Sequence, residues 1–457
     1  MVTRRVQAVG SIFRVVPGYS NMNDEQRPFG FWTATAFVIG GVIGAGIFVL
    51  PSQLASYGWT GAAAWVFGGA GAIVIALVLA AIAAARPQEP GLVAVIGEVL
   101  GPVVGVLTGW GAWVSYWCAN AYIALTAARY ASEFWAPLGA TPLRLALGGS
   151  LVMVGLTLLN LTGLRASGRF QVVTTALRLL PMAAVLIIVV LLMLGGGADF
   201  AREPEAPFVA SNLFAASSLA FVAIVGFESA SIAAQRVRNP ERNIPRATIG
   251  GVALCCLIYL IVCTGIDFAL PQAAVAESKA PVALFIAHYW GSWAGLAVAA
   301  FAVISTVGCL SVWVLLQGEI PLGLVRAGLL PEWLARTNRE DIAVTPIVLG
   351  STLTIVLLVA ASWRDGAAVM DFMLRLTAVT AIWIYAFACL AALRLGVRML
   401  AAALGLGFAL AILYGAGLEA VLLSIVLMAV ALPLYWLARR SLITTARASA
   451  AVAGPPE

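Results

Sequence analysis

The feature that most constrains this chain is a series of apolar segments, each long enough to cross a lipid bilayer. A membrane-spanning helix needs about 17–25 mostly apolar residues, and twelve segments of the sequence reach that length. They are, approximately, 31–53, 59–85, 97–131, 141–163, 168–196, 212–236, 246–270, 292–324, 345–362, 368–395, 398–417 and 420–439. We therefore expect an all-α polytopic membrane protein with twelve transmembrane helices in one domain, 31–439.

The composition supports lipid as the solvent of this chain. Apolar residues make up 62% of the 457 positions and charged residues only 10%, whereas soluble domains carry about 45–50% and about 25%. The remaining stretches, 1–30 and 440–457, are expected to be short tails. The first of them lacks the pattern of a cleaved signal peptide.

The basic residues predict how the chain is oriented. With twelve spans and a cytoplasmic N-terminus, 19 arginine and lysine residues fall in inner segments and 5 in outer ones, while Arg178 and Arg375 fall inside spans. This bias fits the positive-inside rule and predicts that both termini are cytoplasmic in a bacterial-type inner membrane. The net charge of +6 then needs no nucleic-acid partner. The basic run 236–246 has a second interpretation, contact with anionic membrane lipid.

Cysteine and histidine usage argues against metal, cofactor and disulfide chemistry. All six cysteines lie in apolar segments without a CxxC spacing, and His288 is the single histidine. We therefore expect no metal site, no cofactor and no disulfide-linked partner chain. No nucleophile–base set is visible, so a catalytic function is not expected. The sequence leaves open whether the protein is a monomer or a homodimer.

Two of the apolar segments are interrupted by glycine and polar residues. The first contains Gly44-Ala45-Gly46, and the sixth contains Gly226-Phe227-Glu228-Ser229. Glycine weakens a helix by about 1 kcal/mol, and unwound backbone inside a membrane is tolerated only where protein or a water-filled cavity receives it. Two breaks five spans apart predict inverted repeats, 31–196 and 212–395, with substrate held at mid-membrane and two further helices at 398–439.

An alternative interpretation is that these glycines allow helices to pack closely. It applies most directly to Gly40 and Gly41, which precede the first interruption. For residues 44–46 the pairing with a polar interruption in the sixth segment favours binding. A half-helix N-terminus would offer free N–H groups and a positive dipole end to a carboxylate.

Three runs of residues resemble a known transporter family. They are 43–51 (IGAGIFVLP), 226–231 (GFESAS) and 237–245 (VRNPERNIP). On these runs the chain resembles the amino acid–polyamine–organocation (APC) superfamily and, within it, the basic amino acid and polyamine antiporters, including the arginine–agmatine antiporters. The resemblance covers nearly the whole chain. It implies twelve spans, the inverted-repeat fold and alternating access.

The resemblance also implies a substrate site. Its residues would be Ile43, Gly44, Ala45, Gly46, Asn120, Val222, Ala223, Ile224, Gly226 and Trp313. In the family, N–H groups of the first break hold the substrate carboxylate, and carbonyl groups of the sixth-span break, here those of Ala223, Ile224 and Gly226, take the amino group. Asn120 has an alternative role in helix–helix bonding, and Trp313 has one as an ordinary core or lipid-facing tryptophan.

Val222 departs from the pattern of the family. The arginine antiporters carry a tryptophan at this position, which packs on the cationic head of the substrate. Valine removes a cation–π contact of about 0.5–2 kcal/mol, or roughly 2- to 30-fold in affinity. This departure argues against arginine as the substrate and leaves the site for the amino-acid backbone intact.

Ionisable residues inside a membrane are costly and call for an explanation. The resemblance implies that Glu228 serves proton coupling and gating; the alternative is a structural bond to nearby backbone N–H groups. Arg178 occupies the fifth-span position where many members carry a lysine in place of a sodium ion, which predicts sodium-independent transport; the alternative is an ion pair. Asp371 and Arg375 are spaced for a local ion pair, and Asp267 is expected to be solvated.

The function predicted from the sequence is a sodium-independent secondary transporter of amino acids, an exchanger with protons as candidate coupled ions. A different interpretation is an antiporter of polyamines or other amines, which would be expected to need a second acidic residue. A channel should show repeated polar pore residues, and a transport-like sensor should carry a soluble output domain. The sequence shows neither feature, so a channel and a sensor are both less favoured.

Overall fold

The structure is a computed structural model, and it is almost entirely helical. It describes residues 27, 29–86, 92–162, 164–195, 206–229, 237–278, 280–363 and 366–440. Within these ranges, nine helices are long and apolar enough to cross a membrane. The predicted all-α, multi-pass class is therefore confirmed.

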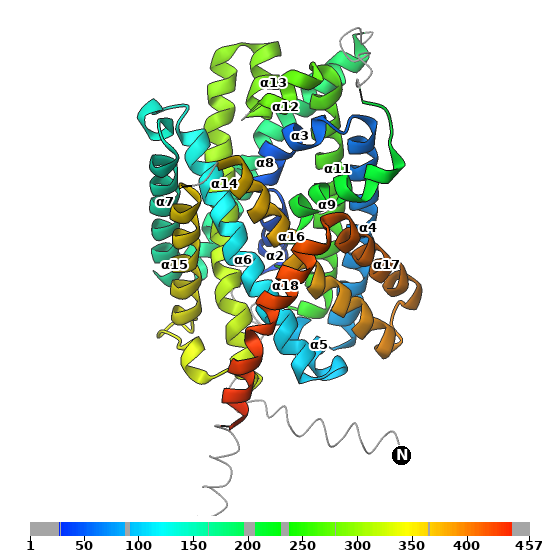
Figure 1. Ribbon diagram of the computed structural model, residues 1–457, viewed down its shortest axis with the longest axis vertical. Coiled ribbons are helices and arrows are strands. Elements are labelled where there is room, and N and C mark those ends of the chain that lie inside the picture. The colour runs from blue at the N-terminus through cyan, green and yellow to red at the C-terminus, as the bar shows by residue number, and fades with distance from the viewer. Residues whose placement is uncertain are drawn as a thin grey trace, which may run out of the picture.

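The helices follow one another with short connections (Figure 1). In the first half they are α2 (Phe31–Val42), α3 (Gly46–Ala55), α4 (Trp59–Ala85), α5 (Leu92–Leu100), α6 (Pro102–Ala131), α7 (Pro142–Thr162) and α8 (Leu164–Leu194). In the second half they are α9 (Leu213–Ile224), α11 (Pro240–Ala269), α12 (Gln272–Glu277), α13 (Pro281–Trp290), α14 (Ser292–Arg326), α15 (Val344–Ala361), α16 (Gly366–Leu395), α17 (Met399–Ala416) and α18 (Leu418–Ala429). Helical residues continue beyond α18 as far as residue 440.

The third predicted span, 97–131, is wrong at its start. The chain forms two helices here, because α5 ends at Leu100 and α6 begins at Pro102. Gly101 between them has a φ of +109°, a conformation that favours glycine. Proline is well suited to the first turn of a helix, where its missing N–H costs nothing. The short helices α12 and α13, of 6 and 10 residues, were not predicted because neither is long enough to give a span signal.

The first and sixth apolar segments are both broken, as predicted. α2 ends at Val42 and α3 begins at Gly46. α9 ends at Ile224, and a turn occupies 225–228. Residues 230–236, the rest of the sixth predicted span, lie outside the described part of the chain.

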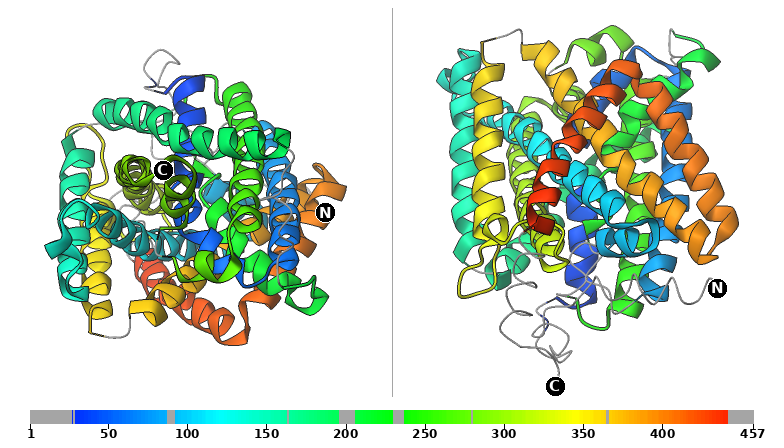
Figure 2. Two further views of the ribbon diagram at one scale, coloured as in Figure 1. Left: turned by 90° about the horizontal axis from the view of Figure 1, so that it is seen from above. Right: turned by 60° about the horizontal axis from the view of Figure 1, so that its bottom comes forward.

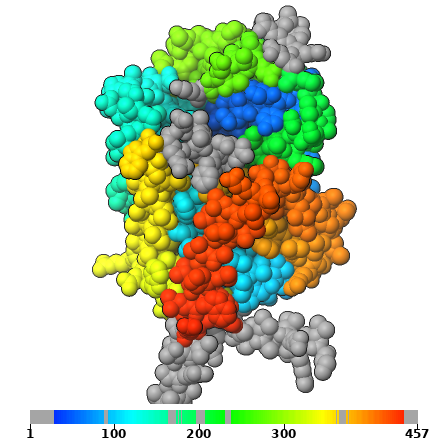
Figure 3. Space-filling view, viewed as in Figure 1, coloured from blue at the N-terminus to red at the C-terminus, as the bar shows by residue number. Residues whose placement is uncertain are grey.

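The broken helices lie in the interior, and other helices face outward. Buried residues make up 83% of the most apolar window of Phe31–Ala55, but only 22% of that of Leu418–Arg440. The side chains of Leu418, Leu422 and Val426 on α18 are exposed, and Figure 3 shows α17 and α18 along one outer face. Exposed apolar surface of this extent fits contact with lipid.

α14 forms the centre of the packing. It is the longest helix, with 35 residues, and contacts α6, α8, α15 and α2. The two views of Figure 2 agree with Figure 1 in placing α7 and α15 on one side of the molecule and α17 on the other. α2 contacts α11, α8 and α14, and α9 contacts α4, α17 and α16, so both broken segments are surrounded by other helices.

Candidate functional site

At the first break, side chains bond the backbone carbonyl groups that the helix no longer uses. α2 ends because Ile43 leaves the helical conformation, with a ψ of 90°. The carbonyl of Gly41 accepts a hydrogen bond from the Trp313 indole N–H at 3.0 Å. The carbonyl of Val42 accepts one from the Tyr259 hydroxyl at 2.9 Å. In a continuous helix both carbonyls would pair with N–H groups four residues on, so these side chains replace the missing donors.

The N–H groups of the same break have no such replacement. Gly44, Ala45 and Gly46 are buried. Among the described residues, none of their N–H groups donates a hydrogen bond. They stand at the N-terminus of α3, where the first N–H groups of a helix lack intrahelical partners and the helix dipole is positive. This end of the break suits an anion.

The second break leaves the opposite kind of group free. α9 ends at Ile224, and Gly226 follows with a φ of +112°, which favours glycine. In the part of the chain that the structure describes, the carbonyls of Ala223 and Ile224 accept no hydrogen bond. The carbonyl of Gly226, predicted to take a substrate amino group, already accepts the Ser229 N–H at 3.1 Å. Two of the three predicted acceptors therefore have no hydrogen-bond donor among the described residues.

The two breaks touch each other through their glycines. A Cβ atom added to Gly226 would lie 2.7 Å from the carbonyl oxygen of Gly41. One added to Gly46 would lie 2.9 Å from the Cβ atom of Ala223. Close packing, the alternative considered for the first-span glycines, is thus present together with the break. The small residues let two unwound segments of backbone approach each other directly.

Glu228 ties the second break to two neighbouring helices. Its side chain is 1% exposed. The carboxyl group accepts hydrogen bonds from the Tyr116 hydroxyl of α6 at 2.8 Å, from the Gly226 N–H at 3.1 Å and from the Tyr385 hydroxyl of α16. The ring of Phe227 stacks on Tyr385 with centroids 4.7 Å apart. The structural bond to backbone that was considered for Glu228 is present, and two tyrosines add to it.

Trp313 lies at the first break, and its ring meets the Tyr116 ring edge to face at 5.0 Å. The Trp313 side chain is 1% exposed. Trp313 bonds the Gly41 carbonyl while Tyr116 bonds Glu228. This aromatic pair therefore joins α14 and α6 to both breaks.

Asn120 belongs to a chain of buried polar side chains that crosses four helices. Its Nδ2 donates to Gln317 Oε1 at 2.9 Å. Nε2 of Gln317 donates to the Ile347 carbonyl at 2.9 Å and to the Ser351 hydroxyl at 3.0 Å, and Ser351 pairs with Thr157 at 2.7 Å. The helix–helix bonding considered for Asn120 is therefore present. Its Oδ1 remains buried, with no partner among the described residues.

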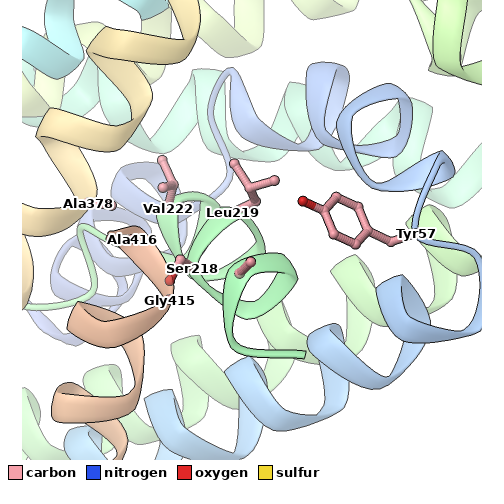
Figure 4. A pocket seen from close by; sticks show the side chains of 8 residues that line it. Tyr57, Ser218, Leu219, Val222, Ala378, Gly415 and Ala416 are labelled. Atoms are coloured by element: carbon pink, nitrogen blue, oxygen red, sulfur yellow. The ribbon is translucent and has the colours of Figure 1, made fainter. Parts of the chain in front are cut away.

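Val222 lines a cavity of about 60 Å³ beside the second break (Figure 4). The other lining residues are Tyr57, Ala215, Ser218, Leu219, Ala378, Gly415 and Ala416. In Figure 4 the Tyr57 hydroxyl points toward Leu219. The Ser218 hydroxyl bonds to backbone carbonyls, so most of the wall is small or apolar. The family position that arginine antiporters fill with tryptophan thus borders open space here.

Three tyrosines of the site, Tyr116, Tyr259 and Tyr385, were missed by sequence reasoning. Tyr116 had a signal, because it lies four residues before Asn120 and so on the same helix face. Tyr259 and Tyr385 stand in apolar stretches of α11 and α16. No local pattern marks them, and only the fold brings them to the breaks.

The remaining ionisable residues fall into two groups. Arg178 lies on α8, and Asp371 and Arg375 lie on α16, but their side chains are outside the described part of the structure. Their roles stay predictions. Asp267 is half-buried, and its Oδ1 is buried with no hydrogen-bond partner among the described residues. The expectation that Asp267 is solvated is therefore wrong for that oxygen.

The sequence of this chain is similar to those of known membrane transporters. The profile of the family described as "Amino acid permease" matches residues 29–445. The cadaverine/lysine antiporter of Escherichia coli (strain K12) is 26% identical over 345 residues, which cover 75% of this chain and 76% of that protein. The arginine/agmatine antiporter of Chlamydia pneumoniae is 24% identical over 444 residues, which cover 90% of each. The putrescine transporter PotE of Haemophilus influenzae is 24% identical over 333 residues, 73% of this chain and 76% of that protein.

A solved structure supports the fold. The crystal structure of MhsT in complex with L-phenylalanine matches with a TM-score of 0.56 at 15% sequence identity. The match covers 87% of this chain and 98% of that one. The likeness extends over nearly all of the helical bundle.

Proposed function

We propose that this chain, which belongs to the amino acid permease family, is a sodium-independent exchanger of amino acids that works by alternating access. The observation that carries the proposal is the opposite polarity of the two facing breaks. The free N–H groups of residues 44–46 suit a carboxylate, and the free carbonyls of Ala223 and Ile224 suit an ammonium group. An α-amino acid carries both groups on one carbon atom.

The proposal extends to the architecture. The breaks in the first and sixth segments support two inverted repeats, 31–196 and 212–395, in a bundle of twelve spans with α17 and α18 outside the repeats. The excess of basic residues in the expected inner segments supports cytoplasmic termini in a bacterial inner membrane.

Two ionisable residues would set the coupling. Glu228 accepts hydrogen bonds from two tyrosine hydroxyls and a backbone N–H. A hydroxyl can also accept, so a proton on the carboxyl would find an acceptor when one tyrosine turns its own hydrogen away. Arg178, on α8, would supply the fixed positive charge that replaces sodium. Because arginine keeps its proton in proteins, the proton carrier would be Glu228 and not Arg178.

A second candidate function is the exchange of polyamines or other amines. A specific observation favours it, since the buried Oδ1 of Asp267 provides the second acidic group that such a substrate would need. The names of the relatives include cadaverine and putrescine. Asp267 lies two helical turns from Tyr259 on α11, and Tyr259 bonds the first break. Under this second candidate function, the Asp267 carboxyl would bind one amine end of the substrate.

Exchange in proteoliposomes tests both candidates. Purified protein is reconstituted with unlabelled lysine inside, and uptake of labelled lysine is measured with choline in place of sodium. We expect saturable uptake that competing amino acids reduce. A requirement for a sodium gradient would contradict the role of Arg178. Uptake of labelled putrescine without uptake of labelled lysine would favour the second candidate, and single-channel currents would support a channel instead.

A thermal-shift panel of the twenty amino acids and common amines gives an independent measure of binding. A ligand that binds the folded state raises the melting temperature, and the shift grows as its concentration exceeds its dissociation constant. We expect shifts for α-amino acids with a free carboxylate and smaller shifts for their methyl esters. A panel in which esters and acids act alike would show that the first break does not bind a carboxylate.

A further inference from the structure

We infer that Gln317 is a positioning residue, because it fixes which end of the Asn120 amide faces the substrate. It thereby determines whether the site takes a side chain that ends in a hydrogen-bond donor or in an acceptor. The inference rests on the proposed function and deepens it, since it names the kind of group that the site takes. The residues involved are fully buried, and they lie beside the pair formed by Tyr116 and Trp313.

The direction of each hydrogen bond follows from the two backbone carbonyls at the ends of the chain. An amide can present its oxygen or its nitrogen, but the Ile347 carbonyl can only accept. Gln317 must therefore turn Nε2 toward it, at 2.9 Å. Oε1 of Gln317 then faces Asn120 and can only accept, so Asn120 must supply Nδ2, also at 2.9 Å.

The hydroxyl groups on the far side agree with this direction. The Thr157 hydroxyl donates to the Met153 carbonyl at 2.8 Å. Its oxygen therefore accepts from Ser351, whose own oxygen accepts from Gln317 Nε2 at 3.0 Å. Every donor along the chain points away from Asn120. Reversing one bond would leave two acceptors facing each other or two donors without acceptors.

Packing holds Gln317 in this orientation. Its side chain is 0% exposed, and a Cβ atom added to Gly350 would lie 2.9 Å from the Gln317 amide. The absence of a side chain at Gly350 thus makes room for the amide. Two hydrogen bonds from Nε2 and one to Oε1 leave little freedom to turn.

As a consequence, the free atom of Asn120 is an acceptor. Its Oδ1 is buried without a partner among the described residues, which is costly unless a ligand supplies a donor. Asn120 lies one turn, about 6 Å, beyond Tyr116 on α6, and Tyr116 bonds Glu228 at the second break. A substrate held by its α-carbon groups at the breaks would present its side-chain end to this acceptor.

The chemistry that satisfies such an acceptor is a terminal N–H donor. An ammonium or guanidinium group donates without needing an acceptor of its own, and a charged donor makes the stronger bond. A side-chain carboxylate would meet the Asn120 oxygen with another acceptor. Gln317 is thus the residue that keeps the Asn120 oxygen turned toward the substrate, and this orientation favours side chains that end in an N–H donor.

The test compares lysine with norleucine, which has nearly the same length but no terminal amine. Inhibition constants for both are measured against uptake of labelled lysine. We expect Gln317→Met to lower the preference for lysine about 5- to 10-fold, because the freed Asn120 amide can turn its NH₂ group toward the substrate. Gln272→Met is the matched control, since Gln272 also bonds backbone but does so at Ala55, the end of α3 opposite to the first break. It should leave the preference unchanged.

Two further variants separate positioning from stability. Gln317→Glu can still accept from Asn120 but cannot donate to Ile347, so we expect lower thermal stability with the lysine preference retained. Asn120→Asp in the Gln317→Met background presents oxygen atoms in either orientation, and we expect it to restore the preference. A preference that Gln317→Met leaves unchanged, or that Asn120→Asp fails to restore, would overturn the inference. Failure of the wild-type protein to bind any amino acid would overturn the proposed function instead.

Discussion

Among the described residues, the N–H groups of residues 44–46 lack a hydrogen-bond partner at the first break, whereas the carbonyls of Ala223 and Ile224 lack one at the second. The difference arises from side chains, two of them on other helices and one within the second break itself. Trp313 and Tyr259 bond the carbonyls of the first break, and Glu228 bonds the Gly226 N–H of the second. Glycine and polar residues open both helices, but the neighbours decide which half of each peptide group stays available. The polarity of the site therefore depends on the side chains around the breaks and not on the glycines alone.

The largest expected effect comes from closing the contact between the breaks. Gly226→Ala places a Cβ atom 2.7 Å from the Gly41 carbonyl oxygen at a φ of +112°. Backbone strain of about 1–3 kcal/mol and overpacking of about 1–3 kcal/mol together predict a loss of roughly 30-fold or more in exchange rate. The rate is measured in proteoliposomes at equal amounts of folded protein.

Gly250→Ala on α11 is the control for this variant. A Cβ atom there meets nothing within 4 Å, so exchange should be unchanged. Wild-type exchange by Gly226→Ala would show that the two segments of backbone do not need to touch.

Glu228→Gln tests how the second break is held. The carboxyl group accepts three hydrogen bonds, and a glutamine offers one acceptor oxygen, so at least one donor becomes unsatisfied. A cost of about 1–3 kcal/mol predicts roughly 5- to 150-fold slower exchange. If Glu228 also carries the proton, the rate of the wild type depends on pH and that of the variant does not.

The control is Glu419→Gln, which changes an exposed carboxylate at the start of α18. Both the rate and its pH dependence should stay as in the wild type. A pH dependence that persists in Glu228→Gln would place the coupled proton on another group.

Val222→Trp tests the part of the site that departs from the family pattern. The indole would enter the cavity beside the second break and offer an aromatic face to a guanidinium group. A cation–π contact of about 0.5–2 kcal/mol predicts arginine affinity that is roughly 2- to 30-fold higher. The inhibition constant of arginine against labelled lysine measures it.

Val222→Leu is the matched control, because leucine fills space without an aromatic face. We expect little gain for arginine in this variant. An equal gain in both variants would mean that filling the cavity matters and that the ring does not.

The parts of this site that could be predicted are those that a few consecutive residues determine. Gly44-Ala45-Gly46 and Gly226-Phe227-Glu228 interrupt apolar segments, and both helices are broken at these positions. The contacts that set polarity join distant parts of the chain, such as Tyr259 with Val42 and Tyr385 with Glu228. An apolar helix gives no local sign of which neighbour it will meet.

The same limit explains the errors in the fold. The predicted start of the third span is wrong because Gly101 and Pro102 interrupt an apolar stretch without lowering its hydrophobicity enough to mark two separate helices. Asp267 was expected to be solvated from its place near a helix end, but packing around α11 buries one of its oxygens. Burial depends on neighbours from other elements, which the sequence around a residue does not describe.

The smallest expected effect tests the donor side of the comparison most directly. Tyr259→Phe removes the hydroxyl that bonds the Val42 carbonyl at 2.9 Å, so this carbonyl becomes free to compete for an N–H group of the first break. A hydrogen bond worth about 0.5–1.5 kcal/mol predicts roughly 2- to 13-fold weaker binding of lysine. Cadaverine has no carboxylate and so does not depend on those N–H groups. Its inhibition constant should therefore stay unchanged. Tyr414→Phe, an exposed position on α17, should affect neither ligand. If lysine and cadaverine binding were weakened equally, the hydroxyl would be stabilising the whole site. The division into a donor break and an acceptor break would then no longer explain which end of the substrate each break holds.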